Sequence, residues 1–87
     1  MNEKEFSQLC KSMTVNYANE HIDKTDNKQI SEDDVFIVWM CKTLQNNKAL
    51  VSTTLYDGMY YEFTYNGDAG ELYFDAYKKF ENRCIKL

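Results

Sequence analysis

The chain contains no proline, only three glycines and a single histidine among its 87 residues. Because no stretch is rich in proline, glycine or serine, no segment has the composition of a flexible linker. No run of 18 apolar residues occurs, and the first 20 residues carry several charges. These features predict neither a transmembrane helix nor a secretory signal peptide. We therefore expect one small domain over residues 1–87, with no membrane contact.

Cysteine is also scarce, with Cys10, Cys41 and Cys84 widely spaced and no Cys-x-x-Cys motif. A disulfide framework normally shows an even number of cysteines in a dense pattern. The three thiols are therefore interpreted as reduced, which favours a cytoplasmic location.

Positive charge is in short supply, since the net charge of −4 arises from 14 acidic and 10 basic residues. Residues 20–34 hold six acids and two bases, whereas the last ten residues hold four bases and one acid. Binding to a phosphate backbone requires clustered lysine and arginine. The acidic balance therefore disfavours direct nucleic-acid binding.

Residues 2–20 are predicted to form an amphipathic helix. Asn2 and Glu5 have the spacing of a capping box at its start. The apolar residues recur on one face with the helical period, and they are Phe6, Leu9, Cys10, Met13 and Tyr17. Residues 22–34 are polar and are expected to connect this helix to the next element.

Residues 35–43 are rich in β-branched and aromatic types, which favours a strand, although a helix is a competing interpretation. Simple alternation places Val35, Ile37, Trp39 and Cys41 on one face and Phe36, Val38 and Met40 on the other. Because both faces are apolar, we expect a central strand that is covered on both sides.

Three further strands are expected at residues 48–55, 59–65 and 71–74, separated by glycine-containing turns. In the second of these, Tyr61, Phe63 and Tyr65 share one face, and Tyr60, Glu62 and Thr64 share the other. A closing helix is predicted over residues 75–84, with Ala76, Tyr77, Phe80 and Cys84 on its apolar face. The expected fold is a two-layer α+β domain with an N-terminal helix, a four-stranded antiparallel meander sheet and a C-terminal helix.

Residues 23–34 have a partial likeness to an EF-hand calcium loop. Oxygen-bearing residues stand at the ligand positions, namely Asp23, Thr25, Asn27, Ser31 and Asp34. However, Lys28 replaces the glycine of the sharp turn, and Asp34 is shorter than the usual bidentate glutamate. We interpret the segment as a solvated acidic connector and expect no metal site.

No arrangement of residues points to catalysis or to a cofactor. His21 has no cysteine or histidine at ligand spacing and is expected to be exposed at a helix end. Nucleophile-elbow, phosphate-loop and paired-carboxylate motifs are absent from the sequence. The chain is therefore predicted to be neither an enzyme nor a cofactor-binding protein.

Aromatic residues are abundant instead, with seven tyrosines, five phenylalanines and one tryptophan. A thin core cannot hide all of them, and tyrosine and tryptophan are common anchors of protein interfaces. The predicted partner-binding residues combine aromatic side chains with the acidic connector, and they are Glu32, Asp33, Asp34, Trp39, Tyr60, Tyr61 and Tyr65.

Residues 38–50, 57–62, 64–68 and 75–79 resemble a family of short proteins encoded by phages and prophages of Gram-positive bacteria, classed as a domain of unknown function. The resemblance implies a phage early gene, expressed in the cytoplasm of a bacterial host, and it carries over no catalytic or binding residue.

Three functions are compatible with these observations. The first is a non-catalytic phage protein that binds and modulates a host or defence protein, acting as an inhibitor. The second is an accessory protein of phage DNA replication or recombination, which would bind a phage protein. The third is a small-molecule binder whose aromatic strands line a pocket. An unpaired first or last strand would also permit a homo-oligomer.

Overall fold

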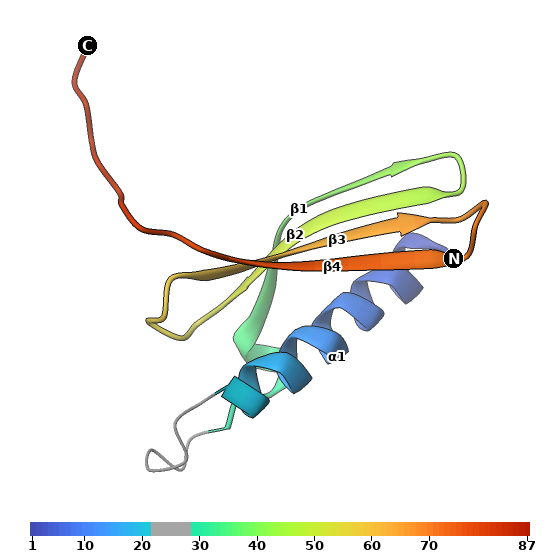
Figure 1. Cartoon of the computed structure of the whole chain (residues 1–87), viewed down its shortest axis with the longest axis horizontal. Helices are drawn as coiled ribbons and strands as arrows, with labels where there is room; N and C mark the ends of the chain where they lie inside the picture. Colours follow the sequence, from blue (N-terminus) through green and yellow to red (C-terminus); the bar gives the residue numbers. More distant parts are fainter. Residues whose placement is uncertain (22–28) are drawn as a thin grey trace.

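A single helix lies across one side of a four-stranded sheet in the computed structural model, which describes residues 1–21 and 29–87 (Figure 1). The elements in chain order are α1 (Glu3–His21), the short 3₁₀ turn η1 (Glu32–Asp34), β1 (Val35–Thr43), β2 (Asn46–Thr53), β3 (Met59–Asn66) and β4 (Glu71–Lys78). The strands pair in the order β1-β2-β3-β4, all antiparallel. The predicted α+β class, N-terminal helix and meander sheet are confirmed.

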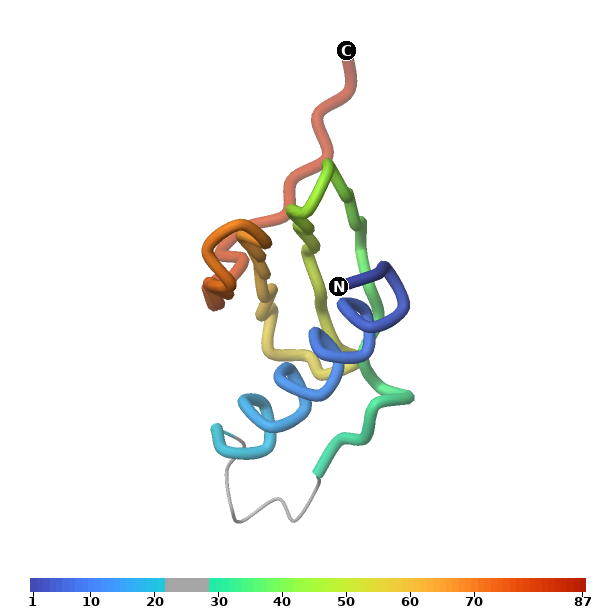
Figure 2. The backbone as a smooth tube through the Cα atoms, turned by 90° about the vertical axis from the view of Figure 1, so that its right-hand side faces the viewer, coloured from blue at the N-terminus to red at the C-terminus, as the bar shows by residue number. Residues whose placement is uncertain are grey.

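Helix α1 begins with the predicted capping box. The backbone N–H of Glu5 donates to Asn2 Oδ1 at 2.8 Å, and the Asn2 N–H donates to Glu5 Oε1 at 3.4 Å. Its buried residues recur every four positions, and they are Phe6, Cys10, Thr14 and Ala18. The helix therefore presents one narrow stripe to the sheet, which it crosses in Figure 2.

The core lies between this stripe and the adjacent side of the sheet. Ala49 and Val51 of β2 and Phe63 of β3 are fully buried there. Phe74 of β4 extends the layer, with its ring centroid 5.1 Å from that of Phe63 and 5.8 Å from that of Tyr61. Aromatic pairs at such distances add to the free energy gained by burial alone.

Strand β1 differs from the prediction in position and in the direction of its side chains. It is an edge strand rather than a central one, and its pairing register with β2 shifts between Ile37 and Trp39. An extra residue in a strand exchanges the faces of all residues beyond it. Val35, Ile37 and Met40 therefore face the helix side, whereas Phe36, Trp39 and Cys41 face the opposite side.

The predicted C-terminal helix over residues 75–84 is wrong. Strand β4 continues to Lys78, where it pairs with Met59, and the Lys79 N–H donates to the Gly58 carbonyl at 2.7 Å. Residues 79–87 contain no regular structure. The full length of β3 offers backbone partners to β4, and these hydrogen bonds prevail over a helical spacing of apolar residues. Among the described residues, no helix is long and apolar enough to cross a membrane.

The turns at one end of the sheet are in close contact. The Gly67 N–H of the β3–β4 turn donates to the side chain of Asn46 at 3.0 Å. A Cβ atom at Gly67 would overlap the carbonyl oxygen of Gln45 in the β1–β2 turn. Gly70 has a φ of +65°, but the space around it is open.

We predict that Gly67→Ala lowers the free energy of unfolding by about 3 kcal/mol, because backbone must move to admit the methyl group. Gly70→Ala is the matched control and costs about 1 kcal/mol through its left-handed backbone alone. Urea unfolding of the two variants measures the difference. Equal losses would contradict the close approach of the two turns.

A second prediction concerns Asn47, which is 2% exposed on the helix side of β2. Within the described residues, neither its side-chain nitrogen nor its oxygen has a hydrogen-bond partner. Because a buried polar group without a partner costs about 1–3 kcal/mol, Asn47→Leu should raise the free energy of unfolding by about 1 kcal/mol. Thermal and urea unfolding check this, and a less stable variant would contradict it.

Candidate partner-binding face

The side of the sheet that faces away from α1 carries neither a helix nor another strand among the described residues (Figure 1). We call this side the open face. Strand alternation and the pairing registers assign to it Phe36, Trp39, Cys41, Lys48, Leu50, Ser52, Tyr60, Glu62, Thr64, Glu71, Tyr73, Asp75 and Tyr77.

Aromatic side chains occupy each of three cross-strand rows on the open face. One row joins Phe36, Ser52, Tyr60 and Tyr77, the next joins Trp39, Leu50, Glu62 and Asp75, and the third joins Cys41, Lys48, Thr64 and Tyr73. Phe36 is 48% exposed, Trp39 43% and Tyr77 52%. Apolar and aromatic surface of this kind, grouped on one face, is typical of a site that contacts another protein.

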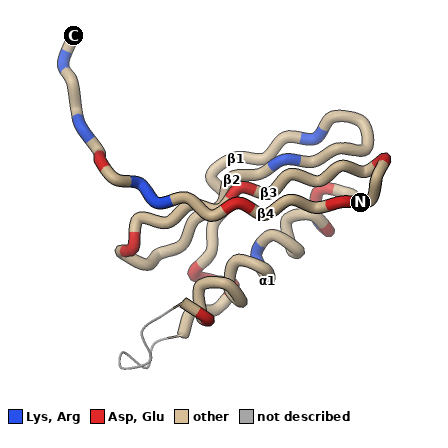
Figure 3. The backbone as a smooth tube through the Cα atoms, in the orientation of Figure 1, with Lys and Arg blue, Asp and Glu red and all other residues tan. Residues whose placement is uncertain are grey.

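Two carboxylates lie directly opposite each other on the open face, since Glu62 of β3 pairs with Asp75 of β4. Like charges in this position destabilise a sheet. Lys48 Nζ lies 3.8 Å from Glu62 Oε1, and within the described residues Asp75 has no ion-pair partner. Figure 3 shows these acids on neighbouring strands, with Glu71 at the start of β4. The β3–β4 half of the face is therefore acidic.

The acidic half also affects its tyrosines. Asp75, followed by Glu62, raises the pKa of the exposed Tyr77, because a nearby negative charge disfavours the tyrosinate. The Tyr73 hydroxyl donates to Glu71 Oε2 at 3.1 Å, and this bond raises the pKa of Tyr73. The same negative field favours a cation at this half of the face.

A shallow hollow of about 590 Å³ lies at one end of the open face. Trp39, Cys41 and Lys48 are among the residues that line it, with Thr64 from β3. Its walls combine an indole ring, a thiol and the stem of a lysine. The hollow can accept one side chain of a partner.

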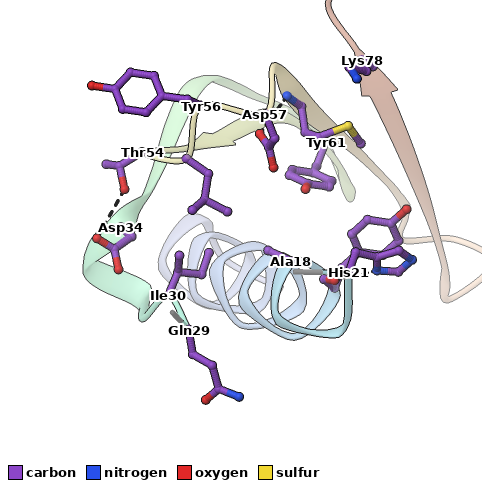
Figure 4. Close-up of a pocket in the computed structure, with 13 residues that line it drawn as sticks. Ala18, His21, Gln29, Ile30, Asp34, Thr54, Tyr56, Asp57, Tyr61 and Lys78 are labelled. Atoms are coloured by element: carbon purple, nitrogen blue, oxygen red, sulfur yellow. Dashed lines mark hydrogen bonds between the residues drawn. The ribbon is translucent and has the colours of Figure 1, made fainter. Parts of the chain in front are cut away.

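A second hollow, of about 850 Å³, lies where α1 ends, on the other side of the sheet (Figure 4). Its polar groups are largely engaged in local contacts. His21 Nδ1 lies 2.8 Å from the Tyr17 carbonyl, so this nitrogen donates. Asp57 accepts the Met59 N–H at 3.1 Å, and Asp34 accepts the Thr54 hydroxyl at 3.3 Å. Burial, followed by the charge of Asp57, raises the pKa of Tyr61 to about 12, so this phenol is neutral.

The predicted aromatic binding residues divide between the two sides of the sheet. Trp39 and Tyr60 belong to the open face. Tyr61 is 1% exposed in the core, where its ring stacks on Phe74. Tyr65 lies on the same side as Tyr61 and is partly buried. The structure thus brings only Trp39 and Tyr60 of these four residues onto one surface.

The predicted acidic binding residues lie beside α1. Glu32 Oε1 accepts hydrogen bonds from Gln8 and from Ser12, the latter at 2.8 Å. Asp34 Oδ2 accepts the Ser31 N–H at 2.9 Å and completes a capping box at η1. Asp33 is exposed. Two of the three carboxylates therefore anchor the start of β1, away from the aromatic rows.

The binding prediction missed most of the open face, including Phe36, Glu62, Tyr73, Asp75 and Tyr77. A signal for the last two is present in the sequence, because the alternation of β4 continues through Asp75 and Tyr77. The predicted helix over residues 75–84 included Asp75 and Tyr77 and therefore placed them outside the sheet.

Half of the segment 23–34, which has a partial likeness to a calcium loop, falls on residues 22–28, and these lie outside the described residues. Of its candidate ligands within residues 29–34, Ser31 and Asp34 are joined in the capping box of η1. In residues 1–21 and 29–87, no group of three or more histidine, cysteine, aspartate or glutamate side chains is placed to hold a metal ion.

Residues 7–87 match the family described as a family of unknown function (DUF6275). The chain therefore belongs to this family, which confirms the expected resemblance to a domain of unknown function. No curated protein and no solved structure matches the chain significantly.

We predict that Asp75→Asn lowers the pKa of Tyr77 toward its ordinary value, because it removes the carboxylate that raises this pKa the most. Asp57→Asn, which lies at the other hollow, is the control and should lower the pKa of Tyr61 while leaving Tyr77 unaltered. An NMR pH titration of the tyrosine Cζ resonances measures both. An unaltered Tyr77 in Asp75→Asn would contradict the acidic field at the open face.

Proposed function

We propose that this member of the DUF6275 family is a non-catalytic protein-binding domain, which modulates its partner by holding it on the open face. The observation that carries the proposal is the exposure of the aromatic rows beside the opposed carboxylates of Glu62 and Asp75. No bound cofactor is required for this function.

The exposed rings supply the affinity. Phe36, Trp39, Tyr73 and Tyr77 are each 43–57% exposed. A fully buried aromatic side chain removes about 150–250 Å² from water, so covering the exposed half of one ring gains roughly 2–3 kcal/mol. Four such rings give a gross gain of roughly 10 kcal/mol, against which the loss of translational and rotational freedom must be set. The face can therefore support a specific complex of moderate affinity.

The carboxylates select the chemistry of the partner. Glu62, Glu71 and Asp75 make the β3–β4 half acidic, so a partner surface with arginine or lysine is favoured there. Guanidinium groups pair with carboxylates and also stack on aromatic rings. The electrostatic role first expected of Glu32, Asp33 and Asp34 is therefore proposed for Glu62 and Asp75.

The biological setting is also a proposal. The resemblance to short phage and prophage proteins supports a role in the cytoplasm of a Gram-positive host. There the partner would be a host or defence protein with a basic surface, such as one that binds nucleic acid, and the chain would act as its inhibitor. The alternative partner is a phage protein of DNA replication or recombination. The hollow at the end of α1 supports the third alternative, a small-molecule role.

A capture experiment tests this function. The tagged chain is expressed in a Gram-positive host during phage infection, and the proteins that co-purify are identified by mass spectrometry. We predict that the double variant Trp39→Ala and Tyr77→Ala loses the partner, because both rings belong to the open face. Tyr56→Ala is the matched control, since Tyr56 is fully exposed in the β2–β3 loop, outside the open face.

The identity of the captured protein distinguishes the alternatives. A host nuclease or replication factor would support the inhibitor, whereas phage replication proteins would support the accessory role. If the double variant retains the partner while Glu32→Ala and Asp33→Ala lose it, binding by the open face is contradicted. The partner would then bind the acidic connector instead.

A further inference from the structure

Residues 79–87, which we call the C-terminal segment, leave the sheet at the end of β4 and extend away from it (Figure 1). Three of its apolar side chains are almost fully in water, with Phe80 92% exposed, Ile85 70% and Leu87 fully exposed. Beyond Lys79, the one side-chain hydrogen bond or ion pair of the segment within the described residues joins Arg83 and Glu81. The family match continues to residue 87, so the segment is part of the family domain.

The charge of this segment is opposite to that of the open face. It holds three bases, Lys79, Arg83 and Lys86, against the single acid Glu81, whereas the whole chain has a net charge of −4. The acids of the β3–β4 half are Glu62, Glu71 and Asp75. Figure 3 shows the bases along the segment and the acids on the strands. Apolar and basic groups in the segment thus match aromatic and acidic groups on the face.

The first residue of the segment already makes a contact of this kind. Lys79 Nζ lies above the Tyr60 ring, 5.7 Å from its centroid. Tyr60 belongs to the row of Phe36 and Tyr77 on the open face. A lysine over the face of a ring gains a cation–π attraction. The open face therefore accepts a basic side chain of this segment.

The length and direction of the segment favour the face of another molecule. Nine extended residues span about 30 Å, which is close to the length of an eight- or nine-residue strand. After Lys79 the segment leads away from its own sheet (Figures 1 and 2). It can therefore cover the open face of a second copy without reversing its course. Under two-fold symmetry the exchange is reciprocal, and each chain gives one segment and receives one.

We propose that the C-terminal segment of a second copy of this chain covers the open face, so that the free protein is a dimer held by exchanged segments. Phe80, Ile85 and Leu87 then pack on the aromatic rows, and Arg83 and Lys86 neutralise Glu62 and Asp75. Because the segment and a basic partner occupy the same face, a partner must displace the segment. This last consequence rests on the proposed function, whereas the dimer does not.

The mass of the purified protein in solution tests the dimer without any partner. Sedimentation equilibrium over a range of concentrations should give twice the mass of one chain for the full sequence, and a single chain for a variant that ends at Lys79. Residues 80–87 are exposed and make no core contact, so the shortened chain should still fold cooperatively. Its unfolding temperature should fall only by the stabilisation that dimerisation gives the full chain. A shortened chain that still dimerises, or a full chain that stays monomeric at all concentrations, would overturn the proposal.

A charge exchange in full-length protein tests the pairing itself. Glu62→Lys with Asp75→Lys alters the face, and Arg83→Glu with Lys86→Glu alters the segment. Each double variant alone should be monomeric. In the first, the new lysines of the face meet Arg83 and Lys86. In the second, the new glutamates of the segment meet Glu62 and Asp75. An equimolar mixture should restore the dimer. In the mixed dimer one contact between segment and face has the native charges, and in the other contact both charges are reversed and attract again. A mixture that remains monomeric would overturn the pairing of segment and face, and leave the capture experiment unaffected.

Discussion

The packing of one helix against one side of a four-stranded sheet is the constraint on which the rest of the structure depends. α1 offers a single buried stripe, with Phe6, Cys10 and Ala18, to the side of the sheet that contains Ala49, Val51 and Phe63. A short chain buries a smaller share of its surface than a long one. The described residues therefore cover one side of the sheet, and the aromatic rows of the other side stay exposed.

The elements that depend on local sequence were predictable. The N-terminal helix and the alternation from Tyr60 to Tyr65 depend on neighbouring residues alone, and both are present in the structure. The buried stripe of the helix shares only Phe6 and Cys10 with the predicted one, because Thr14 and Ala18 complete it while Leu9, Met13 and Tyr17 are partly buried. Two features were not predictable in this way. The register shift near Val38 depends on pairing with β2, and the length of β4 depends on the hydrogen bonds that β3 offers up to Met59. Both are set by contacts between strands, and the sequence alone is compatible with either a longer strand or a helix after residue 74.

The candidate site was predicted in part for the same reasons. Tyr60 was placed correctly because alternation in β3 is regular. Trp39 was predicted on the same face as Val35 and Ile37, but the register shift turns it to the opposite face. Asp75 and Tyr77 were missed because the predicted strand ended at residue 74. Glu32 and Asp34 stand in an acidic run in the sequence, but folding ties both to nearby polar groups. A charge run does not show which of its members are already paired.

The solvent exposure of Trp39 tests most directly whether the open face is free of cover. Trp39 is the only tryptophan of the chain and lies on this face. The measurement is acrylamide quenching of its fluorescence in dilute solution, using the chain that ends at Lys79 so that no second segment can cover the face. We predict an accessible indole with emission at long wavelength in the shortened chain, and shielding with a shift to shorter wavelength in the concentrated full-length protein. An indole that is shielded from acrylamide in the shortened, dilute chain would mean that this side of the sheet is not open, and a binding site there would be ruled out.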